Sequence, residues 1–182
     1  MKLFGKLSSL LLGGSLLFGP SAVATTIEEH QRLIDSLESV GIEVVLNDVA
    51  FCGEEPVDGA YFPINSVLVV CQDYSSPISS KEVEWTPNDL DTLRHEAHHV
   101  VQDCLKGVLG DRESSLLFDE KGEFNSFVIN ALTDEQIENI IESYRERGAD
   151  DETIVMELEA FAVARSVSPD TIADAMDNLC RI

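Results

Sequence analysis

From residue 25 onward, the spacing of apolar residues changes between the helical and the strand-like period. The stretch "TTIEEHQRLIDSLESVG" (residues 25–41) has apolar residues near helical spacing, with Thr26 as cap, Glu29 three residues later and Gly41 as the stop. In contrast, "IEVVLNDVAFC" and "NSVLVVCQD" are β-branched runs, and the Gly- and Pro-containing "GEEPVDGAYFP" separates them. We therefore expect one helix followed by two strands of a small sheet.

Helical spacing returns in the second half of the chain. In "TPNDLDTLRHEAHHVVQDCL" (residues 86–105), Thr86 is the expected cap, Pro87 takes the first helical position and Asp89 completes the capping signature. Residues 107–131 are acidic and mixed, which predicts a loop followed by a short helix. Three further helices are expected in "TDEQIENIIESYRERG", "DDETIVMELEAFAVARS" and "SPDTIADAMDNLC".

These elements predict the fold class. The chain has no internal repeat, low-complexity tract or linker, so residues 25–182 are expected to form a single domain. We expect this domain to be α+β and mostly helical, with the small sheet packed on the helix of residues 86–105.

The first 24 residues have the three parts of a secretory signal peptide. Lys2 and Lys6 provide a positive start, Leu7 to Phe18 form a short apolar run, and Ala22-Val23-Ala24 is a small-residue cleavage site. No later stretch is long and apolar enough to span a membrane. We therefore expect a secreted or periplasmic protein that begins at Thr25 and has no stable membrane association after cleavage.

The net charge of the chain disfavours some classes of binding partner. Without Lys2 and Lys6, the remaining chain has 34 acidic residues against 10 basic ones, a net charge of −24. A chain this acidic repels nucleic acid and anionic membrane surfaces and stays soluble. We expect a monomer that does not bind nucleic acid.

Four cysteines, none of them in a Cys-x-x-Cys pair, are expected to form disulfides in an oxidising compartment. Three pairings are possible. We prefer Cys52 with Cys71, which closes a loop between the two strand-like stretches, and Cys104 with Cys180, which ties the last helix to the helix of residues 86–105.

That helix contains three of the four histidines of the chain. The order His95-Glu96-Ala97-His98-His99 satisfies His-Glu-x-x-His, so His95 and His99 lie one turn apart on one face and can bind one zinc ion. Glu96 can reach a water molecule at the open position of the metal and act as general base. His98 points off this face and is expected to support the site from outside or to be solvated. His30 is expected to be solvated.

A catalytic zinc site with two histidines needs a third protein ligand, and a carboxylate on the helix "TIVMELEAFAVA" is the best candidate. Glu157 and Glu159 point in nearly opposite directions on a helix, so only one of them can face the metal. Glu157 shares its face with Ile154, Ala160, Phe161 and Ala164, whereas Glu159 lies in line with Glu152 and Ser166. A carboxylate among apolar groups needs a partner, so we prefer Glu157 and keep Glu159 as the alternative.

With this glutamate the chain resembles the gluzincin metallopeptidases, in which His-Glu-x-x-His on one helix is completed by a Glu-x-x-Ala motif on a later helix. The matching segments are "HEAHH" and, 58 residues after His99, "ELEA" from Glu157; "EAFA" from Glu159 also fits. The resemblance implies a zincin-like fold, zinc bound by His95, His99 and Glu157, Glu96 as the catalytic base, and peptide or protein substrates. It also makes "NSVLVV" a candidate for the edge strand that aligns the substrate.

Gluzincins usually have a tyrosine or histidine that stabilises the developing oxyanion. Tyr144 is our first choice for this donor and Tyr61 the second. The sequence therefore favours an exported zinc metallopeptidase. The alternative function is a disulfide-stapled binding or structural protein with a non-catalytic zinc site.

Overall fold

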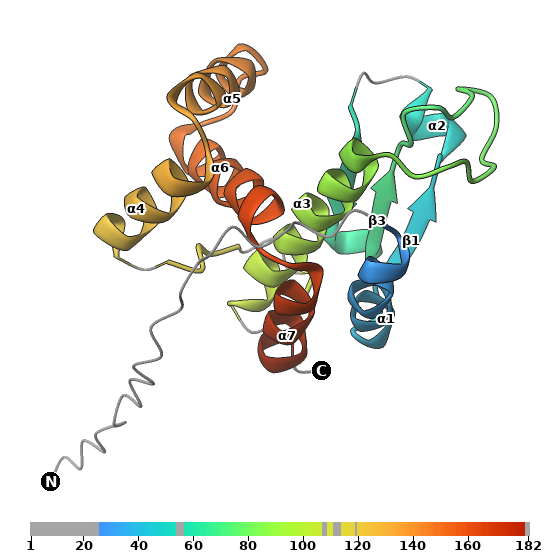
Figure 1. Ribbon diagram of the computed structural model, residues 1–182, viewed down its shortest axis with the longest axis horizontal. Coiled ribbons are helices and arrows are strands. Elements are labelled where there is room, and N and C mark those ends of the chain that lie inside the picture. Colours follow the sequence, from blue (N-terminus) through green and yellow to red (C-terminus); the bar gives the residue numbers. More distant parts are fainter. Residues whose placement is uncertain (1–25, 54–56, 107–108, 111–113, 119, 181–182) are drawn as a thin grey trace, which may run out of the picture.

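The structure is a computed structural model that describes residues 26–53, 57–106, 109–110, 114–118 and 120–180 (Figure 1). The predicted signal peptide lies outside these residues. Helices occupy most of the described chain and a small mixed sheet completes it, so the α+β class is confirmed. The helices are η1 (Glu28–His30), α1 (Gln31–Ser39), α2 (Val49–Cys52), η2 (Pro63–Asn65), α3 (Pro87–Cys104), α4 (Lys121–Ala131), α5 (Asp134–Glu146), α6 (Asp151–Ser166) and α7 (Pro169–Leu179), and the strands are β1 (Glu43–Leu46), β2 (Gly59–Phe62) and β3 (Val67–Val70).

The capping residues that the sequence indicates begin the long helices. Thr86 accepts a hydrogen bond from the backbone of Asp89, whose carboxylate accepts one from the backbone of Thr86, and Pro87 takes the first position of α3. Thr133 and Gln136 form the same reciprocal pair at the start of α5. Within the described residues, neither these helices nor the others combine the length and apolar character needed to cross a membrane.

The sheet differs from the prediction in three ways. Its order is β1-β3-β2, with β3 parallel to β1 and antiparallel to β2. β2 is a third strand, and it lies in the "GEEPVDGAYFP" segment that the sequence indicated as a connection. The stretch containing β3, which was expected to lie at the edge, is central instead. Its side chains Leu68, Val69 and Val70 are buried, as expected for a strand with neighbours on both sides.

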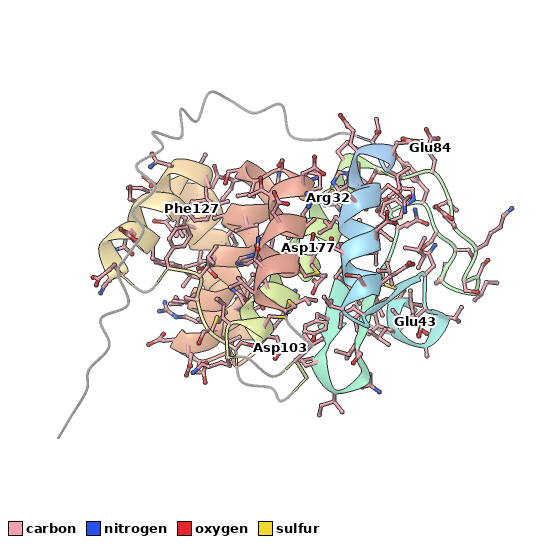
Figure 2. The ribbon with its side chains drawn as sticks, turned by 90° about the horizontal axis from the view of Figure 1, so that it is seen from below. Arg32, Glu43, Glu84, Asp103, Phe127 and Asp177 are labelled. Atoms are coloured by element: carbon pink, nitrogen blue, oxygen red, sulfur yellow. A yellow bond between two sulfur atoms is a disulfide. The ribbon has the colours of Figure 1, made fainter. Side chains whose placement is uncertain are left out.

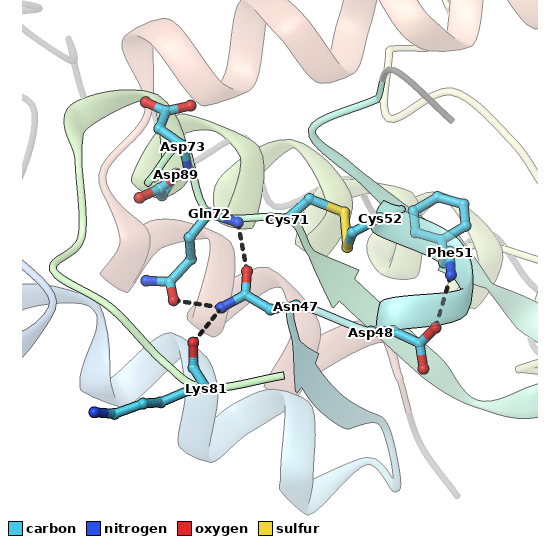
Figure 3. The surroundings of a disulfide bond; sticks show 9 residues. All are labelled: Asn47, Asp48, Phe51, Cys52, Cys71, Gln72, Asp73, Lys81 and Asp89. Carbon is cyan, nitrogen blue, oxygen red and sulfur yellow. Dashed lines mark hydrogen bonds between the residues drawn. A yellow bond between two sulfur atoms is a disulfide. The ribbon is translucent and has the colours of Figure 1, made fainter. Parts of the chain in front are cut away.

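The second half of the first β-branched run is helical rather than extended. Asn47 has a positive φ of 54°, which ends β1, and Asp48 caps α2 by accepting a hydrogen bond from the backbone N–H of Phe51. Cys52 at the end of α2 bonds to Cys71, which confirms this predicted disulfide (Figure 3). Beside it, the buried side chain of Asn47 bonds to Gln72 and to the carbonyl of Lys81, which anchors the long connection after β3 (Figure 3).

α3 lies at the centre of the molecule (Figure 1). It packs against the sheet on one side and against α6 and α7 on the other. The larger apolar core forms between α1, the sheet, α3 and α7. A second apolar cluster lies between α4, α5 and α6, on the side of α6 away from the sheet. The two helices that carry the candidate ligands, α3 and α6, therefore pack against each other at the centre of the molecule.

The C-terminal helix is fixed at two places. Cys180, just after α7, forms a disulfide with Cys104 at the end of α3, which confirms the second predicted pairing. α7 is also held from α1, because Arg32 forms ion pairs with Asp174 and Asp177, and Figure 2 shows Arg32 and Asp177 facing each other.

His30 is not solvated, contrary to the sequence prediction. It is fully buried between α1 and α3. Its Nδ1 lies 2.7 Å from the carbonyl of Thr26 and its Nε2 lies 2.5 Å from the guanidinium of Arg94. Because carbonyl oxygen only accepts and guanidinium only donates, Nδ1 carries the proton and the ring is neutral. Burial lowers the pKa of His30, which agrees with this state.

We expect loss of the Cys104–Cys180 bond to lower the free energy of unfolding by about 2–5 kcal/mol, because the bond restricts the unfolded chain. It joins residues separated by 76 positions, whereas Cys52 and Cys71 are separated by 19. Because the Cys52–Cys71 bond closes the shorter loop, its loss should lower the free energy of unfolding by about 1 kcal/mol less. Urea denaturation of the two double-alanine variants measures this difference, and the reverse order would contradict it.

Candidate metal centre

Three side chains from α3 and α6 converge on one point. The Nε2 atoms of His95 and His99 lie 3.1 Å apart, and Oε2 of Glu157 lies 3.1 Å from the first and 3.5 Å from the second. All three are half-buried or buried. His95, His99 and Glu157 therefore form a group that could hold a metal ion.

The spacing of these three atoms fits a small tetrahedral cation. Zinc binds imidazole nitrogen and carboxylate oxygen at about 2.0–2.2 Å, which places neighbouring tetrahedral ligands about 3.4 Å apart. The separations of 3.1, 3.1 and 3.5 Å are close to this value. Two imidazoles and one carboxylate are also a donor set that zinc takes in catalytic sites.

Contacts beside the ligands hold α6 in register with α3. Arg94, which precedes His95, donates from Nε to the carbonyl of Ala164 at 2.8 Å. Gln102 donates from Nε2 to the carbonyl of Met156 at 3.1 Å, and Met156 immediately precedes Glu157. These two contacts bracket the ligand group, so the position of Glu157 relative to the histidines is fixed by buried hydrogen bonds.

The ligand group is electrostatically coupled. Burial acts to raise the pKa of Glu157, but hydrogen bonds and charge from His95 and His99 outweigh burial and lower that pKa well below its usual range. Burial acts to lower the pKa of His99, but the hydrogen bond and charge of Glu157 outweigh it and raise the pKa to about 9. The carboxylate thus attracts positive charge to the point where the three donors meet.

Glu96 is next to this group and almost fully buried. Burial raises the pKa of its carboxyl group, while the backbone N–H of Tyr61 on β2 donates to it and limits that rise. Gly59 on the same strand has no room for a side chain, because a Cβ atom there would lie 2.6 Å from Thr92 and 3.3 Å from Glu96. β2 therefore packs closely against the base candidate and positions it.

A pocket of about 320 Å³ opens beside the ligands. His95 and Glu96 lie in its wall, and so does Tyr144 from α5. Burial raises the pKa of Tyr144, and the charge and hydrogen bond of Glu157 raise it further, so the hydroxyl stays protonated and can donate. The other lining residues come from the start of β2 and the segment before it, from α3, from α5 and its C-cap, and from α6: Val57, Asp58, Gly59, Asn88, Asp91, Thr92, Asn139, Ile140, Ser143, Arg147, Phe161, Ala164 and Arg165.

Tyr61, the second choice for an oxyanion donor, is used elsewhere. Its hydroxyl donates to Oδ2 of Asp103 at 2.8 Å, and the same carboxylate oxygen accepts the backbone N–H of Gly110. Tyr61 is not among the residues that line the pocket. Of the two tyrosines, the structure places only Tyr144 beside the ligand group.

Glu159, the alternative third ligand, lies outside the ligand group. The structure therefore corrects this alternative in favour of Glu157. It is fully buried and bonds to Nε2 of His98 at 3.0 Å. His98 is buried as well, and burial lowers its pKa. It therefore lies beside the site as a supporting residue and is not solvated. Sequence reasoning missed Gln102, which lies between His99 and Glu159; its place three residues after His99, on the same helix face, is the signal that could have identified it.

Comparisons of the chain with protein-family models, curated proteins and solved structures gave no significant match. The geometry of the described residues is therefore the basis for any functional assignment.

We expect Glu157→Ala to weaken zinc binding by more than about 100-fold, beyond the loss typical of residues that only support a ligand. The change removes one of three donors, while the buried contacts around it remain. Glu152→Ala, an exposed acid on the same helix, is the matched control and should bind zinc as the wild type does. Competition with a chelating indicator measures both, and equal affinities would exclude Glu157 as a ligand.

Proposed function

We propose that this protein is an exported, zinc-dependent metallopeptidase. The observation that carries the proposal is the convergence of His95, His99 and Glu157 beside a pocket whose wall contains His95, Glu96 and Tyr144. Two disulfides fit a protein that functions outside the reducing cytosol.

A bound zinc ion would polarise the scissile carbonyl and make water a better nucleophile at neutral pH. Glu96 would then accept the proton of the attacking water and deliver it to the leaving amine. Its position beside the ligands, and the raised pKa of its carboxyl group, support this use as an acid and a base. The hydrogen bond from the backbone of Tyr61 holds the carboxylate in place during both transfers.

Tyr144 is the proposed donor to the negative charge that develops on the carbonyl oxygen. Its hydroxyl lies in the pocket wall and interacts with Glu157. The guanidinium of Arg147, which also lines the pocket, lies 5.8 Å from the centre of its ring. A fixed donor of this kind stabilises the transition state more than the substrate.

β2 is the proposed support for an extended peptide, in place of β3. Among the described strands it pairs only with β3, so its other edge has no strand partner. The carbonyl of Asp58 faces β3, where it accepts from Cys71, so the backbone groups of Gly59 face the free edge. Residues 57–59 also line the pocket, which supports an extended peptide bound along this edge with its scissile bond near the ligand group.

The alternative, a non-catalytic zinc site in a binding or structural protein, has less support. Structural zinc sites are almost always completed by four protein ligands. In the described part of the chain the ligand group has three, and a pocket adjoins it. A structural site also has no use for a buried carboxylate in the position of Glu96.

We expect Glu96→Gln to keep zinc and the fold and to lower peptidase activity by at least about 100-fold. The amide oxygen can still accept the N–H of Tyr61, but it cannot take a proton from water. The assay is cleavage of a labelled unfolded protein by the zinc-loaded variant, with Glu123→Gln as an exposed control. Activity near that of the wild type would refute the proposed mechanism.

For Tyr144→Phe we expect kcat to fall by about 100-fold with little change in KM, because the hydroxyl donates most strongly in the transition state. Tyr74→Phe removes a hydroxyl from a tyrosine that is 74% exposed and serves as the control. A rise in KM with unchanged kcat would instead assign Tyr144 to substrate binding.

A further inference from the structure

Glu159 is a buried carboxylate whose capacity to accept hydrogen bonds is used completely. Its oxygens accept from Nε2 of His98 at 3.0 Å and Nε2 of Gln102 at 2.9 Å. They also accept from the backbone N–H groups of Leu117 at 2.9 Å and Phe118 at 3.3 Å. Backbone N–H groups only donate, so the Oε1 atom that faces Leu117 and Phe118 acts only as an acceptor.

This carboxylate fixes the orientation of the Gln102 side chain. The NH₂ group of Gln102 lies against Glu159 at 2.9 Å and against the carbonyl of Met156 at 3.1 Å, and a carbonyl only accepts. Rotation of the amide by 180° would place its oxygen against a carboxylate and a carbonyl. Because Gln102 is 1% exposed, water could not compensate for that arrangement. The amide oxygen must therefore point away from Glu159.

The amide oxygen points at His99, where it lies 2.8 Å from Nδ1. An amide oxygen only accepts, so Nδ1 of His99 must carry a proton. In a neutral imidazole the lone pair then belongs to Nε2, which is the atom that faces His95 and Glu157. The carbonyl of Met156 and the carboxylate of Glu159 thus select, through the Gln102 amide, which nitrogen of His99 is free to bind a cation.

We propose that Gln102 and Glu159 are positioning residues of the metal centre, which set the tautomer and ring orientation of His99. This role rests on the proposed metal site. Gln102 also holds the carbonyl of Met156, the residue before Glu157, so one side chain positions two of the three ligands. Groups that orient ligands from outside in this way typically change metal affinity by about 10–100-fold.

His95 provides an internal contrast. Its Nδ1 is buried and has no hydrogen-bond partner among the described residues. The ring is held instead by packing against Phe161, with ring centres 4.3 Å apart. A hydrogen bond to Nδ1 therefore orients the ring of His99 but not that of His95. Loss of the contacts from Glu159 through Gln102 should affect the two histidines unequally.

The test measures zinc affinity and the proton positions of the histidine rings. Gln102→Leu removes the acceptor for His99 at similar size, and Glu159→Gln keeps the shape but weakens one of the two acceptors that hold the Gln102 amide. Each should weaken zinc binding by about 10–100-fold while circular dichroism and both disulfides stay unchanged. Glu152→Gln is the matched exposed control on α6 and should bind zinc like the wild type.

Nitrogen-15 NMR of the zinc-loaded wild type should show the ring proton of His99 on Nδ1 and zinc on Nε2. In Gln102→Leu the His99 signals should change more than those of His95, which a general loss of stability would not produce. Folded variants with wild-type affinity, or a wild-type His99 bound to zinc through Nδ1, would overturn the positioning role. If Glu159→Gln does not fold, Gln102→Leu and the wild-type spectrum decide. Absence of zinc binding by the wild type would overturn the metal centre itself and this role with it.

Discussion

The burial of polar groups on α3 is the constraint on which the rest of the structure depends. Fourteen residues of this helix are buried, and eight of them are polar or charged. A buried polar group without a partner costs about 1–3 kcal/mol, so a helix of this kind is stable only if other segments bring hydrogen-bond partners to it. They do so from every side: the loop after β3 binds Asp89, η1 and α6 bind Arg94, β2 binds Glu96 and Asp103, and α6 binds His98 and Gln102.

These partners position the candidate site. Glu157 meets the histidines because α6 is already attached to α3 by Arg94 at one end and by Gln102 at the other. The ligand group therefore uses a helix contact that the buried hydrogen bonds determine, and it does not have to assemble by itself. Preorganisation of this kind lowers the entropy that ligand ordering would cost when a cation binds.

Local patterns predicted the features with local causes. Caps, glycine stops and β-branched runs depend on neighbours a few residues away, so the starts of α3 and α5 could be read from Thr86 and Thr133. His95 and His99 were identifiable because a spacing of four residues is itself a helix contact. β2 was missed because its four residues lie among glycine, proline and acids, and only its pairing with β3 makes them a strand. The states of His30 and Glu159 were inaccessible because their partners are 64 and 61 residues away.

The buried carboxyl groups around the ligand group need balancing positive charge. Glu157 and Glu159 are both ionised, since hydrogen bonds and nearby charge lower the pKa of each, and Glu96 adds a third carboxyl group whose pKa burial raises. Opposite them stand three histidines, of which His98 is kept neutral by burial. A protonated His99 neutralises only one of these carboxylates. A divalent cation held by the ligand group would offset the charge of both ionised carboxylates and let His99 give up its proton. Cation binding would then be linked to the stability of the α3–α6 contact through the same buried charges.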